Sequence, residues 1–438
     1  MSLHYGIENL RANQRWYLIL IIGLIVLVTN GIAYTYWDTT LGGRLENVVA
    51  LVLLVYFVSI LPTIREYRFY KIVLLLTFLP FLSGINSYAI YGQPPLKTFT
   101  VTMSNFIWLI YFPLKAFRIR ESTILHSLLI TAIVIFVIQV VQQLTFPNAY
   151  FGVVSEELMN EGGGYQQEIA EKRNGLWRFR MHMNGYFTTP IIFAALIWLK
   201  QKFDFKMISL FILFLISIYL SLTRLVIFST IVTIFMSFFL GRRKGTVRSL
   251  LIAFALIACL FFFYDEFFLS LSKRTSTEMS ESNIRVLAAS YYIQEIFKTP
   301  LTFLFGYGNA ATGAFRDHVN TLMSVYHFYA SDVGFVGKTW HYGIVYVIVC
   351  YYLLYILFFK YKRQIPLYIR LFVMYTAIMS PMIFPFYRNI YWLIWAMLLY
   401  ICELHINGSP LRMKSTSQDL GINTKQVKLR SYLRDNKR

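Results

Sequence analysis

Several arginines stand at positions where their side chains could bind a phosphate group. Arg224 separates two long apolar stretches, and Arg285 begins a segment with the pattern of an amphipathic helix. Three further arginines, Arg173, Arg178 and Arg180, belong to one basic and aromatic run. The planar guanidinium group binds two phosphate oxygens at once, so several of them in one pocket would suit a diphosphate. The alternative for Arg224 is a side chain that extends to lipid headgroups.

The candidates for accepting a proton lie in one region of the chain. Asp332 is the first candidate for a general base and His327 the second, followed by His318 and His341. A cap at a helix N-terminus is the structural alternative for Asp332. The sequence has no cluster of His and carboxylate residues suited to a divalent metal, so we expect no metal and no other cofactor. The expected substrate-binding cations are Arg173, Arg178, Arg180, Arg316, Lys338 and Arg388.

These residues must be positioned by membrane-spanning helices, because the composition excludes a soluble protein. Hydrophobic residues make up 57% of the 438 residues and charged residues 14%, whereas soluble domains have roughly 25% charged residues. We predict an all-α polytopic membrane protein with about twelve transmembrane helices. The predicted spans are 16–34, 46–63, 72–90, 99–114, 123–143, 186–199, 207–222, 225–240, 249–265, 335–359, 367–386 and 389–404.

The distribution of positive charge predicts the orientation of these spans. The formal net charge is +20. About two thirds of the 41 Lys and Arg residues fall in the N-terminal segment, in alternate short connections and in the tail, as the positive-inside rule requires of cytoplasmic segments. We therefore expect both termini to be cytoplasmic. Because topology accounts for the excess charge, the charge gives no reason to expect nucleic acid as a partner.

Two of the predicted outer loops are long, at about 144–185 and 266–334. Long structured loops are usually functional. The second loop contains a predicted amphipathic helix from Asn283 to Lys298, capped by Ser282 and ended by Thr299-Pro300. This helix must bury its apolar stripe against protein or the bilayer, so we expect the loop to cover the outer membrane face. The stripe consists of Ile284, Leu287, Ala288, Tyr291 and Tyr292.

The chain is predicted to form one domain. Residues 1–404 make up the transmembrane domain with its two outer loops, and residues 405–438 form a basic cytoplasmic tail. The tail is polar and poor in aromatic residues, so we expect it to be disordered or to lie on anionic headgroups.

Four short motifs between about 215 and 360 occur in a characteristic order. Thr223-Arg224 stands at the outer end of a hairpin of spans, and Arg285 begins the helix of the second long loop. A Gly306-Tyr307-Gly308 turn follows, and Ser331-Asp332 then precedes Gly343-Ile344 within the next span. This arrangement resembles the polysaccharide polymerase and ligase superfamily of bacterial envelopes, in particular the Wzy-type O-antigen and exopolysaccharide polymerases. Many members of that family have a histidine at the position of Ser331, whereas here His327 lies four residues earlier.

The resemblance implies a GT-C-like, metal-independent glycosyltransferase. It would join undecaprenyl-pyrophosphate-linked oligosaccharide repeat units at the outer face of the bacterial inner membrane. Arg224 and Arg285 would hold the departing pyrophosphate, and Asp332 or His327 would take the proton of the attacking sugar hydroxyl. The implied partners are the lipid-linked donor and acceptor, membrane lipids and a chain-length regulator.

Two other functions remain open at the level of the sequence. An O-antigen ligase, or another transferase of lipid-linked glycans, would use the same motifs. A transporter or flippase would also fit twelve spans with both termini inside. The two halves of the chain show no obvious internal repeat, and the long loops lie on the outer side, which favours a transferase.

Overall fold

The computed structural model describes residues 2–28, 39–145, 170–173, 176–179, 188–201, 204–240, 283–386 and 389–408. The predicted ninth span (249–265), most of the first long loop, the start of the second and the tail beyond residue 408 lie outside this part of the chain. The described chain is almost entirely helical, apart from one two-stranded antiparallel hairpin. The predicted all-α fold class is confirmed to this extent.

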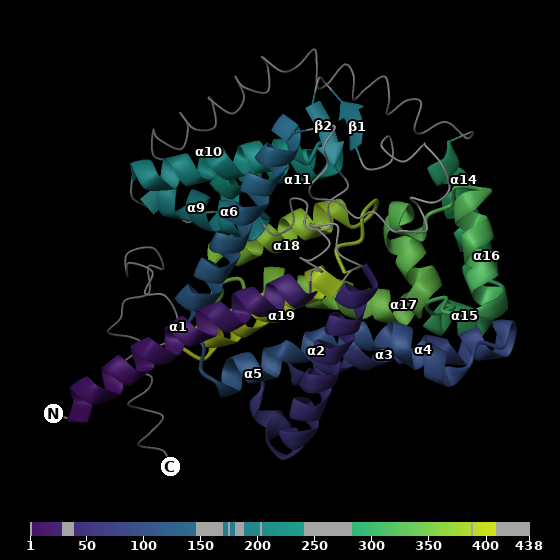
Figure 1. Ribbon diagram of the computed structural model, residues 1–438, viewed down its shortest axis with the longest axis horizontal. Coiled ribbons are helices and arrows are strands. Elements are labelled where there is room, and N and C mark those ends of the chain that lie inside the picture. The colour runs from purple at the N-terminus through teal and green to yellow at the C-terminus, as the bar shows by residue number, and fades with distance from the viewer. Residues whose placement is uncertain are drawn as a thin grey trace.

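Most of the predicted spans that the structure describes coincide with helices (Figure 1). The first half contains α1 (Ser2–Val28), α2 (Thr39–Ser59), η2 (Leu61–Glu66), α3 (Tyr70–Tyr91), α4 (Pro95–Thr102), η3 (Met103–Ile110), α5 (Tyr111–Ala116) and α6 (Glu121–Thr145). The hairpin of β1 (Ala170–Arg173) and β2 (Leu176–Phe179) precedes α9 (Thr188–Gln201), α10 (Phe205–Leu220) and α11 (Arg224–Leu240). The last part contains α14 (Ile284–Ile296), α15 (Pro300–Phe305), α16 (Gly313–Ser324), η5 (Ala330–Val333), α17 (Gly334–Tyr355), η6 (Ile356–Lys360), α18 (Leu367–Met379) and α19 (Asn389–Ile406).

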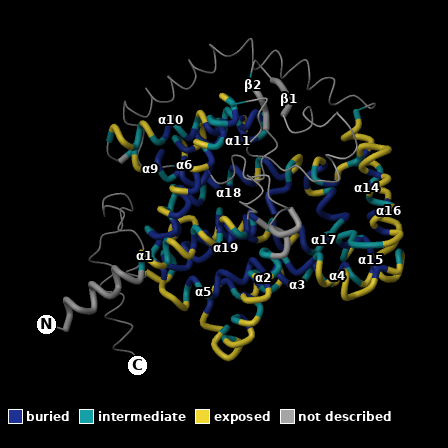
Figure 2. The backbone as a smooth tube through the Cα atoms, viewed as in Figure 1, coloured by how far each residue is buried: buried dark blue, intermediate teal, exposed yellow. Residues whose placement is uncertain are grey.

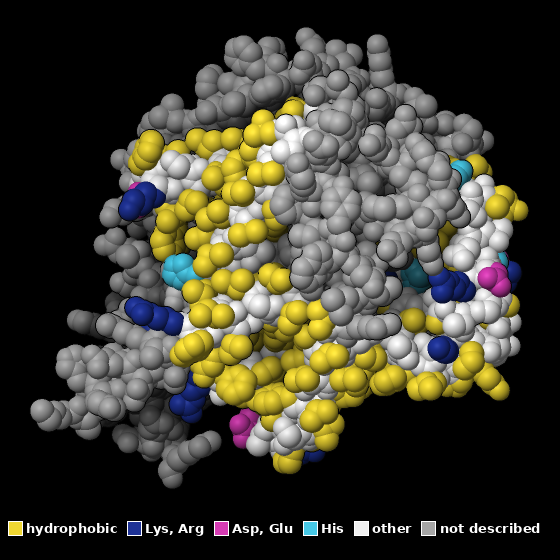
Figure 3. Space-filling model, in the orientation of Figure 1, with side chains coloured by type: hydrophobic (Ala, Val, Ile, Leu, Met, Phe, Trp, Pro, Cys, Tyr) yellow, Lys and Arg dark blue, Asp and Glu magenta, His cyan; other side chains and the backbone are white. Residues whose placement is uncertain are grey.

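Three of the described helical stretches are long and apolar enough to cross a membrane: Tyr70–Tyr91, Glu121–Thr145 and Ala330–Lys360. Seven shorter apolar helices accompany them, among them α9, α10, α11 and α18. Apolar side chains cover much of the surface in Figure 3, and charged side chains lie mainly near its two ends. Val55, Leu96 and Phe205 are each at least 70% exposed. An apolar surface of this extent is typical of a protein that contacts lipid.

Two predicted spans differ from regular helices. The fourth, 99–114, is divided among α4, the 3₁₀ helix η3 and α5. Pro113 cannot donate the hydrogen bond that would continue an α-helix through this stretch. The eleventh, 367–386, ends as a helix at Met379, just before Pro381, which explains why its last residues are irregular.

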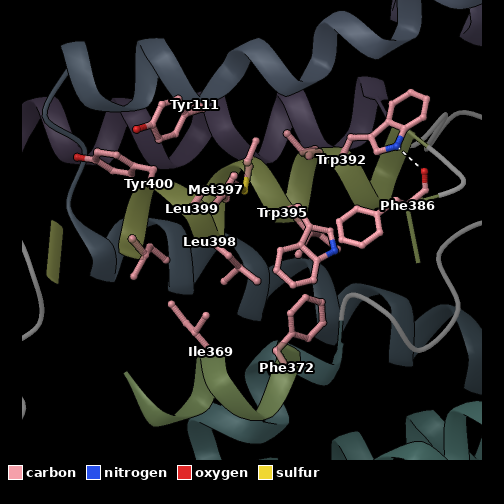
Figure 4. Packing of buried hydrophobic residues seen from close by; sticks show 14 of the residues in the cluster. Tyr111, Ile369, Phe372, Phe386, Trp392, Trp395, Met397, Leu398, Leu399 and Tyr400 are labelled. Carbon is pink, nitrogen blue, oxygen red and sulfur yellow. Dashed lines mark hydrogen bonds between the residues drawn. The ribbon is translucent and has the colours of Figure 1, made fainter. Parts of the chain in front are cut away.

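Helix α19 forms the centre of the bundle, and nearly all of its side chains are buried (Figure 2). Figure 4 shows α19 between Tyr111 of α5 on one side and α18 on the other. The Trp395 ring lies 5.1 Å from the ring of Phe372 of α18 and 5.2 Å from that of Phe386. Trp392 Nε1 donates a hydrogen bond to the Phe386 carbonyl at 2.7 Å, which fixes the start of α19. Elements η3, α5, α1 and α6 also pack on α19.

Two buried carboxylates join helix ends at one end of the bundle. Glu403 of α19 accepts a hydrogen bond from Lys115 Nζ at 2.6 Å. Glu121 of α6 accepts one from the Tyr368 hydroxyl at 2.8 Å, and its other oxygen lies 2.9 Å from His405 Nε2. Lys115 and Glu121 belong to the segment 115–122, Tyr368 to 360–370 and His405 to the residues after 404, which share one predicted orientation, and Glu403 lies at the end of the last predicted span. The structure therefore places these segments on one side of the bundle.

The described part of the second long loop, from residue 283 onward, lies at the opposite end of the bundle. Helix α3 runs between the two ends, because Arg68, just before it, donates a backbone hydrogen bond to Glu403 at 3.3 Å. Tyr91, its last residue, stacks on Phe315 of α16 with the ring centres 4.4 Å apart. Helices α14 to α16 are thus separated from the buried carboxylates by the length of α3 (Figure 1).

Candidate functional site

The described part of the second long loop folds as a compact unit with its own hydrophobic core. The core residues come from α14, α15–α16, η5 and the start of α17: Ala288, Tyr292, Ile296, Tyr307, Phe315, Leu322, Ala330, Val333 and Trp340. The prediction that this loop buries an apolar helix face is confirmed for Ala288 and Tyr292. Ile284 and Leu287 are 43% and 47% exposed, so they do not pack on protein, and their contact with the bilayer stays a prediction.

The ends of the loop helix differ slightly from those predicted. The side chain of Asn283 accepts a hydrogen bond from the Arg285 backbone N–H at 2.8 Å, so the cap is Asn283 instead of Ser282, which lies outside the described residues. The helix ends at Ile296, before the predicted Lys298. Thr299 then starts α15, where it exchanges hydrogen bonds with Thr302 in a capping box.

The Gly306-Tyr307-Gly308 turn is attached to a break in α17. The backbone of Gly343 has φ +79° and ψ 168°, which interrupts the helix. The Tyr307 and Gly308 N–H groups donate to the carbonyls of Trp340 and His341, each at 2.7 Å. These carbonyls lie just before the break, so N–H groups of the turn donate to them where the hydrogen-bond pattern of the helix is interrupted. The two glycine motifs found in the sequence are therefore in direct contact.

Polar side chains of α3 hold the same turn from its other side. Asn86 Nδ2 donates to the carbonyls of Gly306 at 2.7 Å and Leu301 at 3.0 Å, and the Ser87 hydroxyl donates to the Tyr307 carbonyl. The sequence analysis missed these residues. Their signal was a pair of adjacent polar side chains inside the apolar stretch 72–90.

Three of the four predicted catalytic residues lie in this unit, and all three are exposed. Arg285 occupies the first turn of α14, and Asp332 lies in η5, which packs on α14. His327, with φ +55°, stands between α16 and η5. The Asp332 carboxylate accepts a hydrogen bond from the Ser331 hydroxyl at 3.2 Å. Burial, together with the nearby Asp332 charge, raises the pKa of Tyr292, which keeps that hydroxyl protonated beside the candidate base.

Other predicted residues lie elsewhere. Arg224 is the first residue of α11, which packs on α18 and α9, so it belongs to another part of the bundle. Arg173 and Arg178 belong to β1 and β2, where Arg178 is paired in register with Glu171, and β2 packs on α6 and α10. An Asn-Gly pair between these segments was an overlooked hairpin signal. Arg316 is exposed on α16, and Arg180 and Arg388 lie outside the described residues.

Lys338 occupies a very different environment from the exposed arginines. Its side chain is 2% exposed, although it lies near the start of α17. The Nζ atom lies 4.0 Å from the ring centre of Tyr342 and 5.6 Å from those of Tyr346 and Trp392. These contacts are cation–π interactions, which stabilise a partly desolvated ammonium group. The structure therefore buries a lysine amino group among aromatic rings close to the outer unit.

The two remaining histidine candidates make contacts within the unit. His318 Nε2 lies 3.1 Å from the Tyr291 hydroxyl, and its ring stacks on Tyr91. Burial lowers the pKa of His318 below its usual value of 6.5, so this ring is neutral at pH 7. His341 Nδ1 lies 3.1 Å from the Gly308 carbonyl, next to the break in α17. Both histidines are held in place by the core of the unit and its turn.

Within the described ranges, no group of three or more His, Cys, Asp or Glu residues is arranged to hold a metal ion. No family model matches the chain, and a comparison with curated proteins finds no match either.

Proposed function

We propose that this protein is a membrane glycan polymerase that joins oligosaccharide repeat units carried on undecaprenyl pyrophosphate. The observation that carries the proposal is the presence of Arg285, His327 and Asp332, all exposed, in one folded unit at one end of a membrane bundle. These residues are separated by up to 47 positions in the sequence. A transferase needs cations and a base near the same reacting carbon, and this unit provides both types.

The proposed reaction takes place at the end of the bundle that carries α14 to α16. A sugar hydroxyl of the acceptor attacks the anomeric carbon of the donor, and Asp332 takes the proton of that hydroxyl. Arg285 and Arg316 of this unit, together with Arg224 supplied by α11 from outside the unit, would neutralise the pyrophosphate that leaves with the lipid. In this proposal the loop unit faces the outside of a bacterial inner membrane, with both termini in the cytoplasm, since the described basic segments 64–71 and 115–122 lie at the other end.

The identity of the general base gives the test of this proposal. Asp332→Asn should preserve the local hydrogen bond with Ser331, because an amide oxygen also accepts, yet remove the proton acceptor. A general base contributes roughly 10²- to 10⁴-fold to the rate, so cells with this variant should accumulate single repeat units on the lipid. His327→Gln tests the rival base. Asp317→Asn is the matched control, because Asp317 is an exposed carboxylate on the neighbouring α16.

The measurement is the profile of lipid-linked oligosaccharides in the deletion strain and in strains with each variant at equal protein level. Single repeat units on the lipid in the deletion strain support a polymerase. Completed polymer that stays on the lipid would identify a ligase instead. If the deletion leaves the lipid-linked oligosaccharides at the outer face unchanged, the result would favour a transporter. If Asp332→Asn makes normal polymer and His327→Gln does not, the base is His327.

A further inference from the structure

Helix α3 exposes an apolar stripe that runs along the helix toward the loop unit of α14 to α16. The exposed side chains recur every three or four residues, so they lie on one face of the helix. They are Leu75, Phe78, Leu82 and Ile85. Because Tyr70–Tyr91 is long and apolar enough to cross a membrane, we expect this face to contact lipid.

Two short helices flank this stripe at the end of α3 that meets the loop unit. Helix α15 packs on α3, and Asn86 Nδ2 donates to the Leu301 carbonyl at 3.0 Å. Helix α4 also packs on α3, and the ring centres of Phe99 and Phe81 lie 5.6 Å apart. With about 3.6 residues per turn, Phe81 and Asn86 fall on opposite sides of the face that contains Ile85. The stripe therefore ends between α4 and α15.

Both flanking helices add exposed apolar side chains to the stripe, together with Phe297 at the end of α14. The Phe297 ring stacks on Phe303 of α15 with the ring centres 5.2 Å apart. We call the residues that are between 38% and 74% exposed here the α4–α15 edge: Leu96, Phe297, Leu301 and Leu304. Figure 3 shows apolar side chains along the lower side of the molecule, where Figure 1 places α3, α4 and α15. Helix α16 differs, because its exposed side chains are mainly polar: Arg316, Asp317, Asn320, Thr321 and Ser324.

The charged residues of this region select the molecule that covers the edge. Lys97 and Lys298 are the only charged residues in segments 84–102 and 296–305, and both are exposed. Lys298 Nζ lies 2.6 Å from Glu295 Oε1, but the lysine side chain remains 61% exposed. Tyr88 is also exposed, near the same end of α3. Apolar side chains bordered by lysine and tyrosine are typical of the membrane–water interface, so an anionic headgroup on an apolar chain matches both parts of the edge.

We propose that the α4–α15 edge is a phospholipid-binding surface and that α15 lies within the leaflet at this end of the bundle. Acyl chains cover Leu301 and Leu304, and phosphate groups contact Lys97 and Lys298. Removal of the exposed apolar side chains from water drives the contact. The sequence assigns residues 266–334 to a loop outside the bilayer, whereas this arrangement immerses one edge of the loop unit and leaves α16 in water. The inference goes beyond the proposed function and holds whether or not the protein polymerises glycans.

The test uses the full-length protein in vesicles of a phospholipid that is brominated in its acyl chains. A fluorescent label on Leu301→Cys or Leu304→Cys loses fluorescence when it contacts brominated chains, relative to vesicles of the same lipid without bromine. We expect this loss at both positions. The unmodified protein gives the background of labelling, since Cys350 and Cys402 are buried.

Two matched variants calibrate the loss of fluorescence. Ile85→Cys places the label on the stripe of α3, where it should be quenched to a similar extent. Asn320→Cys places the label on α16, where it should keep its fluorescence. All four labelled positions are exposed, so their substitution should leave the temperature of thermal unfolding nearly unchanged.

The lysine contact is tested separately with anionic and neutral brominated phospholipids. A label on Leu96→Cys reports which of the two lipids lies beside α4. Lys97→Gln should lower the preference for the anionic lipid roughly 5-fold, the contribution of one lysine near an anionic membrane surface. Lys71→Gln is the control, because Lys71 is exposed at the opposite end of α3 and should leave this preference unchanged.

Each outcome decides the proposal. Quenching at Leu301 and Leu304 but not at Asn320 supports it, as does a lowered preference for anionic lipid in Lys97→Gln. Labels at Leu301 and Leu304 that keep their fluorescence would overturn the contact with acyl chains, and an unchanged lipid preference of Lys97→Gln would overturn the headgroup contact. If unlabelled Leu301→Cys forms a disulfide-linked dimer and the labelled form is not quenched, a second copy of the chain covers the edge and the proposal is wrong.

Discussion

Gly343 offers the most direct test of how the Gly306–Gly308 turn is attached to α17. Its φ of +79° and ψ of 168° lie in a region that is essentially restricted to glycine. A Cβ atom added there would lie 2.0 Å from the Leu304 carbonyl oxygen and 2.3 Å from its carbonyl carbon. Both atoms belong to the backbone, so Gly343→Ala can be accommodated only if α15 and α17 move apart.

The expected cost follows from these contacts. A residue other than glycine in this backbone region costs ~1–3 kcal/mol. Separation of α15 from α17 also breaks the two hydrogen bonds from Tyr307 and Gly308 to α17, at ~1 kcal/mol each. We therefore expect Gly343→Ala to lower the free energy of unfolding by about 4 kcal/mol.

Gly92→Ala is the matched control for the backbone effect. Gly92 also has a positive φ, +66°, but an added Cβ meets nothing within 4 Å, so its cost should be limited to ~1–2 kcal/mol. Pulse proteolysis of the detergent-solubilised protein across a denaturant series gives the fraction that is folded. Equal midpoints for the two variants would refute the attachment of the turn to α17.

Three further predictions concern topology, substrate binding and pH. Ala310→Cys should react with an impermeant maleimide in intact spheroplasts, and reaction only after lysis would reverse the orientation. Arg224→Lys and Arg285→Lys should each lose roughly 10²- to 10³-fold in polymer synthesis at normal expression, because an ammonium cannot span two phosphate oxygens, and full activity of both would contradict their roles. Burial lowers the pKa of His318, so the folded protein binds a proton at this ring less readily than the unfolded chain. As the pH falls below the usual histidine pKa of 6.5, the protein should therefore lose stability relative to His318→Gln, whereas above that pH the difference in stability should not change. Thermal unfolding of both proteins at pH 7.5 and about pH 5.5 measures this difference.

Local patterns in the sequence were sufficient to predict several features of the fold. Runs of apolar residues predicted most of the helices, because a chain in hydrocarbon must satisfy its backbone hydrogen bonds within each segment. The apolar periodicity of residues 283–298 predicted a helix that buries one face against protein or the bilayer, and Tyr292 of that face is buried in the core of its unit. The fourth span was the exception, because Pro113 and a buried 3₁₀ stretch divide it although its hydropathy is continuous.

The contacts between distant segments were decided only by the tertiary structure. The sequence identified Gly306 and Gly308 as a turn and Gly343 as part of a separate motif, but their backbone contacts depend on how α15 and α17 meet. In the same way, Lys338 looked like one more outer cation, and its burial against Tyr342 depends on the packing of η3, α17 and α19. Hydropathy and periodicity predict whether one segment forms a helix and which of its faces avoids water. The partner of a buried polar atom, in contrast, is set by the three-dimensional arrangement of several segments.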